Sequence, residues 1–116
     1  MSNHINRRIA SLRELIRVGL HQENLDRIVA ECNALAQDTP HGLTFFVLKQ
    51  LFAEISVALE EEPVGVEQHK ELTSGLAKAS FVMLDKIEEN QSVEFEELES
   101  IVRTHVRNLN VFRSDR

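Results

Sequence analysis

Histidine and cysteine are the residues of this chain best suited to bind a metal or to act in catalysis. The histidines lie on separate segments, at His4, His21, His41, His69 and His105. A metal site in a helical bundle needs Glu and His three residues apart, because both side chains must point at one ion. The sequence contains no Glu-x-x-His, no His-Glu-x-x-His and no Cys-x-x-Cys. We therefore expect no metal site and no bound cofactor.

The single cysteine, Cys32, does not look like a nucleophile. At helical spacing its neighbours are Ile28 and Leu35, and such surroundings raise the pKa of a thiol and hide it. A lone cysteine also forms no disulfide within the chain, which agrees with a reducing compartment. We expect a packed, inert side chain.

Two acidic clusters, residues 60–62 and 94–99, invite comparison with magnesium sites, in which several carboxylates converge on one octahedral ion. The first cluster runs directly into Pro63. The second occupies the first turns of an expected helix, where carboxylates favour the positive helix end. Neither cluster has the spacing of a metal site, so we expect a protein that is not an enzyme.

His105 is the polar residue that most needs explaining, because it stands in an apolar seam between Val102 and Leu109. An imidazole in such a position must find a hydrogen bond or lie at an interface. We expect a core histidine, with a pH-sensitive contact or a ligand-binding role in a cavity as alternatives. At an interface, its protonation near about pH 5–6 would weaken association.

The most apolar stretch, residues 40–60, is the element around which the other helices must be arranged. Thr39 can cap this helix, Pro40 suits its first position, and Pro63 stands where it ends. At about 100° per residue, most of its apolar side chains merge into one wide face. That face consists of Phe45, Val47, Leu48, Leu51, Phe52, Ile55, Ala58 and Leu59. We expect a central apolar helix with several neighbours.

A second, narrower stripe runs along the other side of this helix. It consists of Phe46, Gln50, Ala53 and Val57, at 4-3-4 spacing. The helix expected over residues 66–89 carries a similar secondary stripe, made of Ala77, Phe81 and Leu84. Apolar stripes outside the main face usually meet a partner, so these are the candidate interface residues of a homodimer.

Four more amphipathic segments complete the chain. We expect helices over residues 3–18, from the cap Asn24 to residue 36, over residues 66–89 and from the cap Ser92 onwards. The last helix repeats apolar positions at Phe95, Leu98, Val102, His105, Leu109 and Phe112. Gly19 is placed to end the first helix in a left-handed turn. Short loops between such helices predict an all-α, up-and-down bundle of five helices, with residues 1–116 as a single domain.

Charge is distributed unevenly along this acidic protein. The net charge is −6, yet residues 1–20 carry four arginines against one glutamate, and residues 101–116 carry four arginines against one aspartate. The alternative function is therefore a nucleic-acid-associated regulator whose first and last helices pool their charge. Its contacts would be Arg7, Arg8, Arg13, Arg17, Arg103 and Arg107.

We favour a protein partner over nucleic acid. A helix-turn-helix frame can be laid over residues 14–28, but it places Asp26 and Glu31 on the recognition helix, where carboxylates repel phosphate. We expect no membrane span, because no apolar run approaches the required length, and the polar start lacks a signal-peptide core. The sequence thus favours a small cytoplasmic, non-enzymatic protein that acts through protein–protein contacts, adaptor-like or structural, and self-associates.

Overall fold

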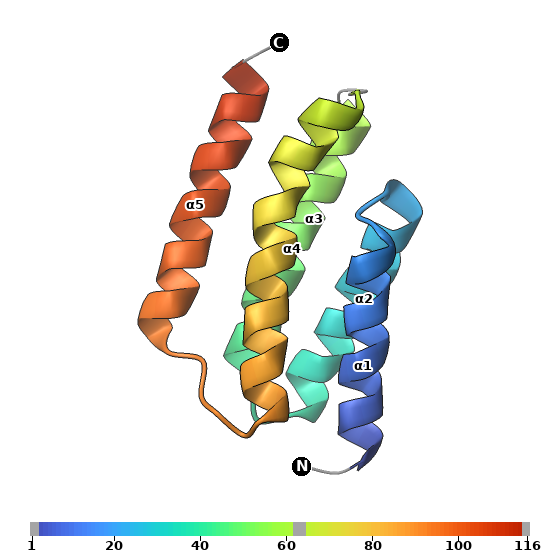
Figure 1. Ribbon diagram of the computed structural model, residues 1–116, viewed down its shortest axis with the longest axis vertical. Coiled ribbons are helices and arrows are strands. Elements are labelled where there is room, and N and C mark those ends of the chain that lie inside the picture. Colours follow the sequence, from blue (N-terminus) through green and yellow to red (C-terminus); the bar gives the residue numbers. More distant parts are fainter. Residues whose placement is uncertain (1–2, 62–64, 115–116) are drawn as a thin grey trace.

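Five helices form in the residues that the structure, a computed structural model, describes, which are 3–61 and 65–114. Their bounds are α1 Asn3–Val18, α2 Gln22–Asp38, α3 Gly42–Glu61, α4 Val66–Glu88 and α5 Phe95–Ser114. Successive helices run in opposite directions, so the chain is an up-and-down bundle (Figure 1). The predicted all-α architecture is confirmed.

The helices form an elongated body with principal extents of 45 × 29 × 20 Å. α3 packs against α2, α4 and α5, while α4 packs against α1, α3 and α5. α1 and α5 lie on opposite sides of the body with α4 between them and do not touch (Figure 1). The predicted central helix α3 therefore has neighbours on three sides.

The core consists of one apolar face from each helix. Its largest fully buried side chains include Phe45 and Phe52 of α3 and Leu25, Ile28 and Leu35 of α2. All eight residues of the predicted wide face of α3 are buried or half-buried. Removing a large apolar side chain from water contributes about 1.5–3 kcal/mol, so this face is the main source of stability for α3.

α3 is also long and apolar enough to cross a membrane, by length and composition alone, and it is the one such helix in the described part of the chain. The expectation that no apolar run approaches this length is therefore wrong. In the structure its wide face packs against α2, α4 and α5, as in the core helix of a globular bundle.

The turn between α1 and α2 is closed by local contacts. Gly19 has a φ of 139°, so the predicted positive-φ turn is confirmed. Asn24 does not cap α2, which begins two residues earlier at Gln22; its Nδ2 instead donates to the carbonyl of Gly19 at 2.9 Å. A short polar side chain that binds a nearby carbonyl can close a turn as well as cap a helix.

Two other predicted starts also shift along the chain. α5 begins at Phe95 rather than after Ser92, because the carbonyl of Glu94 accepts the first amide bonds. The Thr39 hydroxyl donates to the carbonyl of Leu35 and accepts from the His41 amide at 3.2 Å, so it joins the end of α2 to the approach of α3. Pro63, predicted to end α3, lies outside the described residues.

Candidate functional site

The predicted second stripe of α3 lies on the surface. Phe46 and Val57 are 48% and 47% exposed, Gln50 is exposed and Ala53 is half-buried. On one side of this stripe Ser56 receives a hydrogen bond from α2, and on the other side Glu54 bonds to α5. The stripe is therefore the side of α3 that its own neighbours leave uncovered.

α5 adds exposed apolar side chains to the same side of the molecule. Phe95, Val102 and Val106 are 64%, 36% and 47% exposed. Around the axis of α5, His105 faces α3, to which it bonds, and Thr104 lies beside α4. Measured from His105, Val102 and Val106 are rotated by roughly 60° and 100° in the direction away from Thr104. The two valines therefore point away from α4 and towards the outer side of α3.

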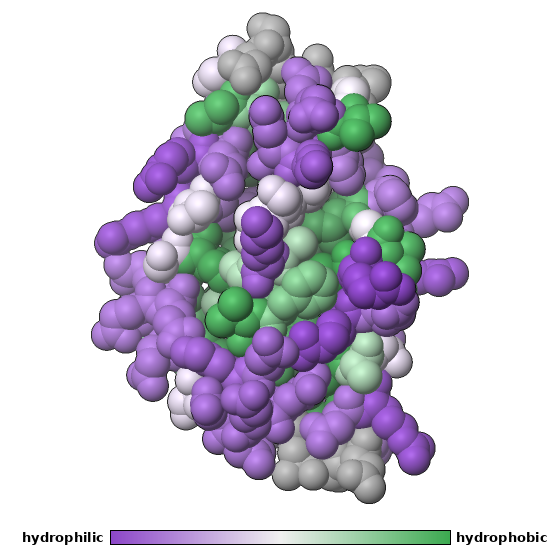
Figure 2. All heavy atoms as spheres, viewed as in Figure 1, coloured by the Kyte–Doolittle hydropathy of each residue, from purple (hydrophilic) through white to green (hydrophobic). Residues whose placement is uncertain are grey.

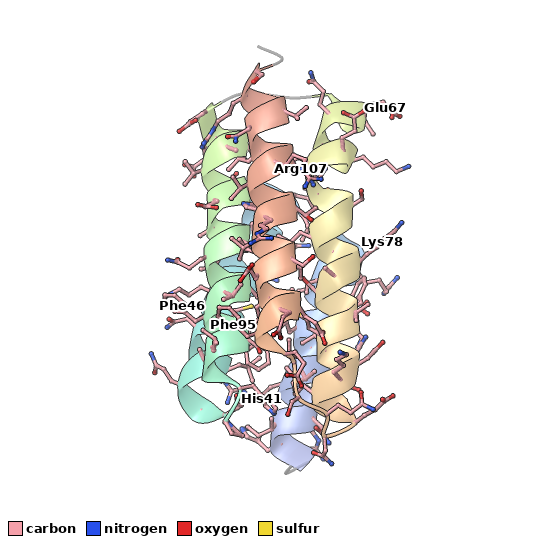
Figure 3. All side chains as sticks on the ribbon, turned by 90° about the vertical axis from the view of Figure 1, so that its left-hand side faces the viewer. His41, Phe46, Glu67, Lys78, Phe95 and Arg107 are labelled. Carbon is pink, nitrogen blue, oxygen red and sulfur yellow. The ribbon has the colours of Figure 1, made fainter. Side chains whose placement is uncertain are left out.

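We call these surface residues of α3 and α5 the outer face. It comprises Leu43, Phe46, Gln50, Val57, Phe95, Val102 and Val106. Figure 3 shows Phe46 and Phe95 at similar heights on the two adjacent helices. The Lys49 ammonium lies 5.0 Å from the centroid of the Phe46 ring and forms a cation–π contact. A grouped set of exposed apolar side chains is typical of an interaction site.

The second predicted interface stripe does not lie on the surface. Leu84 is fully buried, and Ala77 and Phe81 are half-buried against the core. The guanidinium of Arg13 lies over the Phe81 ring at 6.0 Å, because α1 packs on this side of α4. The prediction of an interface here is corrected: this stripe forms the contact between α4 and α1.

The predicted core seam of α5 is wrong at two positions. Phe95 and Val102 are exposed, and Ile101 packs against the core instead. Since residues 101 and 102 are both apolar, two stripes fit the sequence, and the direction from which α5 meets α3 and α4 decides between them. The sequence prediction misses the outer face on α5 because it places Phe95 and Val102 in the core and does not include Val106.

His105 is a core histidine, as expected. It is 4% exposed, and its Nε2 lies 2.9 Å from Oε1 of Glu54, whose side chain is more than half exposed. The hydrogen bond to the Glu54 carboxylate satisfies the buried imidazole, which would otherwise carry a desolvation penalty. His105 is covered by its own chain, so the premise of weakened association at low pH, a histidine at an interface between chains, is not met.

The six arginines of the alternative function do not form one surface. Arg8, Arg13, Arg17 and Arg103 each form an ion pair with a carboxylate of this chain. α1 and α5, which carry the six, are separated by α4. The pooled basic patch that this alternative requires is therefore absent from the described residues.

Two other chemically capable side chains, Cys32 and His69, have structural roles. Cys32 is fully buried, and burial, aided by the negative charge of Glu31, raises the pKa of its thiol to about 12. His69 Nε2 lies 2.8 Å from the Leu20 carbonyl oxygen, and its ring stacks on His21 with centroids 6.4 Å apart. Among residues 3–61 and 65–114, no three His, Cys, Asp or Glu side chains gather where they can hold a metal.

No protein-family model, curated protein or solved structure matches this chain. Its function is therefore inferred from the molecule alone, and the outer face is the candidate site.

Proposed function

We propose that this chain is a small cytoplasmic, non-enzymatic protein that acts through protein–protein contact and forms a homodimer through the outer face. The observation that carries the proposal is the exposure of Phe46 and Val57, nearly half each, on a helix whose other sides its own chain covers. Burying such side chains on association is favourable by about 25 cal/mol per Å² of apolar area. α5 extends the same apolar surface with Val102 and Val106.

The order of residues on α3 suits a twofold axis. Phe46 and Val57 are eleven residues apart, roughly 16 Å along the helix, with Gln50 and Ala53 between them. In an antiparallel crossing centred between Gln50 and Ala53, Phe46 of each copy meets Val57 of the other. Ala53 permits close approach, and the Gln50 amide, both donor and acceptor, can bond to its symmetry mate.

Ionic strength provides a further check on an apolar interface. Each chain carries a net charge of −6, so two copies repel one another at long range. Salt screens this repulsion and leaves apolar burial in place. We therefore expect association to tighten as salt rises, whereas an interface held by ion pairs would weaken.

The direct test is a charge placed at both ends of the stripe. The double variant Phe46→Glu/Val57→Glu should be monomeric in sedimentation velocity, because each carboxylate would be buried against an apolar partner. The matched control is Val18→Glu/Val66→Glu, which changes two valines that are 57% and 82% exposed on other helices. The control should associate like the original chain.

Circular dichroism separates folding from association in this test. Both substituted residues of the stripe are exposed, so the helical signal should not change. A double variant that is folded and still dimeric contradicts the proposed interface.

A further inference from the structure

A row of cavities lies between α4 and α5. The inner cavity, about 240 Å³, has an apolar floor that includes Leu72, Leu76 and Ile101, and it reaches His105. The outer cavity, about 230 Å³, adjoins it towards the C-terminal end of α5 and shares Leu72. Figure 2, viewed as Figure 1, shows apolar residues exposed among polar ones in the middle of the view, over α4. Together the two cavities reach the size of small-molecule pockets, roughly 300–1,000 Å³.

Gly75 borders the inner cavity, and close packing does not require a glycine at this position. A Cβ at this position would meet only Nδ2 of Asn108 among other residues, at 3.8 Å, which is an ordinary contact distance. Gly inside a helix is less favourable than Ala by about 0.5–1 kcal/mol. The sequence therefore carries a destabilising residue whose visible effect is to leave space beside α4.

Four polar side chains surround the outer cavity. Gln68 and Glu71 come from α4, and Arg107 and Asn108 come from α5. In the described part of the chain, none of the four forms a hydrogen bond or ion pair, although the cavity holds one group of each charge. Figure 3 shows the Arg107 side chain extending from α5 towards α4. The same cavity is lined by Leu72 and Phe112.

His105 provides one hydrogen-bond acceptor to the inner cavity. With Nε2–H donating to Glu54, the neutral imidazole keeps Nδ1 as an acceptor, and no described residue bonds to it. The inner cavity therefore accepts an apolar group and can also accept one hydroxyl donor. The outer cavity offers a cation and an anion.

We propose that the groove between α4 and α5 binds a free α-amino acid with a large apolar or aromatic side chain. Arg107 binds the carboxylate and Glu71 the ammonium, which fits the opposite charges of a zwitterion. The side chain passes Gly75 over Leu72 and Leu76 towards His105. This site is separate from the outer face, so its failure would leave the proposed dimer untouched.

Isothermal titration calorimetry with L-phenylalanine, L-tyrosine and L-leucine tests the proposal. We expect saturable binding of one amino acid per chain for at least one of the three, with a dissociation constant between micromolar and millimolar. Two analogues, 3-phenylpropionate and phenethylamine, each lack one charged group and should bind at least tenfold more weakly than L-phenylalanine. Equal binding of 3-phenylpropionate would overturn the ammonium contact and assign the groove to simple carboxylates.

Variants locate the binding site. Arg107→Gln and Glu71→Gln should each weaken binding at least tenfold, whereas Arg103→Gln, whose arginine pairs with Glu99, should not change it. Both target residues are exposed, so these variants should fold, which circular dichroism checks. Gly75→Ala should raise the melting temperature and weaken binding. No heat of binding with any of the three amino acids, or binding unaffected by Arg107→Gln and Glu71→Gln, overturns the proposal.

Discussion

The pair α2–α3 and the pair α4–α5 are both antiparallel helices joined by short loops, yet they pack differently. Large side chains fill the space around α2 and α3, where Ile28, Leu35 and Phe52 are fully buried. Between α4 and α5, residues as small as Gly75 and Thr104 face one another across cavities. Both pairs follow the same helical periodicity. Side-chain volume at facing positions, rather than periodicity, therefore decides whether two helices pack closely.

The largest effect on stability should come from removing the Phe52 ring from the closely packed pair α2–α3, here called the closed pair; α4–α5 is the open pair. Phe52→Ala should lower the free energy of unfolding by about 3–5 kcal/mol, because the surrounding residues cannot fill the cavity it leaves. Phe112→Ala, at a half-buried residue beside the α4–α5 cavity, should lower it by less than half as much. Urea unfolding measures both. Equal losses would remove the distinction between the two pairs.

Close packing around Cys32 should also make the stability of the protein depend on pH in alkaline solution. The folded pKa of Cys32 is about 12, above the ordinary value of 9.0, so the folded state keeps a proton that the unfolded state loses. Stability should therefore fall as pH rises from about 9 to 12, by up to about 1.4 kcal/mol per pH unit. Cys32→Ala should lack this contribution, so the difference between the two chains isolates it. An identical pH dependence in both would contradict the burial of the thiol.

A smaller effect of opposite sign should distinguish two glycines. Gly75→Ala should raise the free energy of unfolding by about 0.5–1 kcal/mol, since a Cβ has room in the open pair. At Gly42, the first residue of α3, a Cβ would come within 3.1 Å of the Ala36 carbonyl oxygen, so Gly42→Ala should give no gain or a loss. Thermal unfolding measures both variants. A loss at Gly75 would mean that α4 and α5 pack more closely than described.

Much of the fold could be predicted from the sequence because apolar spacing is a strong signal for long helices. For this reason the sequence correctly predicts the wide face of α3 and the packing of Cys32 between Ile28 and Leu35 on α2. Helix starts were less predictable, since Asn24 and Ser92 have capping side chains but lie beside the true starts rather than at them. Capping residues also close turns, and the sequence alone does not separate the two uses.

The candidate site was only half predictable. The exposed stripe of α3 followed from its spacing, whereas Val102 was assigned to the core because Ile101 beside it is equally apolar. Leu84 was assigned to a surface stripe that α1 covers. The cavities beside Gly75 depend on the separation of two helices, which no local pattern encodes.

We propose that the outer face joins two copies of the chain. The decisive experiment is multi-angle light scattering of the purified protein, at low and high salt and over a range of concentrations. We predict a mass of twice 13.3 kDa at high salt, with dissociation on dilution favoured at low salt. A mass of 13.3 kDa under every condition would contradict the claim and leave the outer face without its proposed partner.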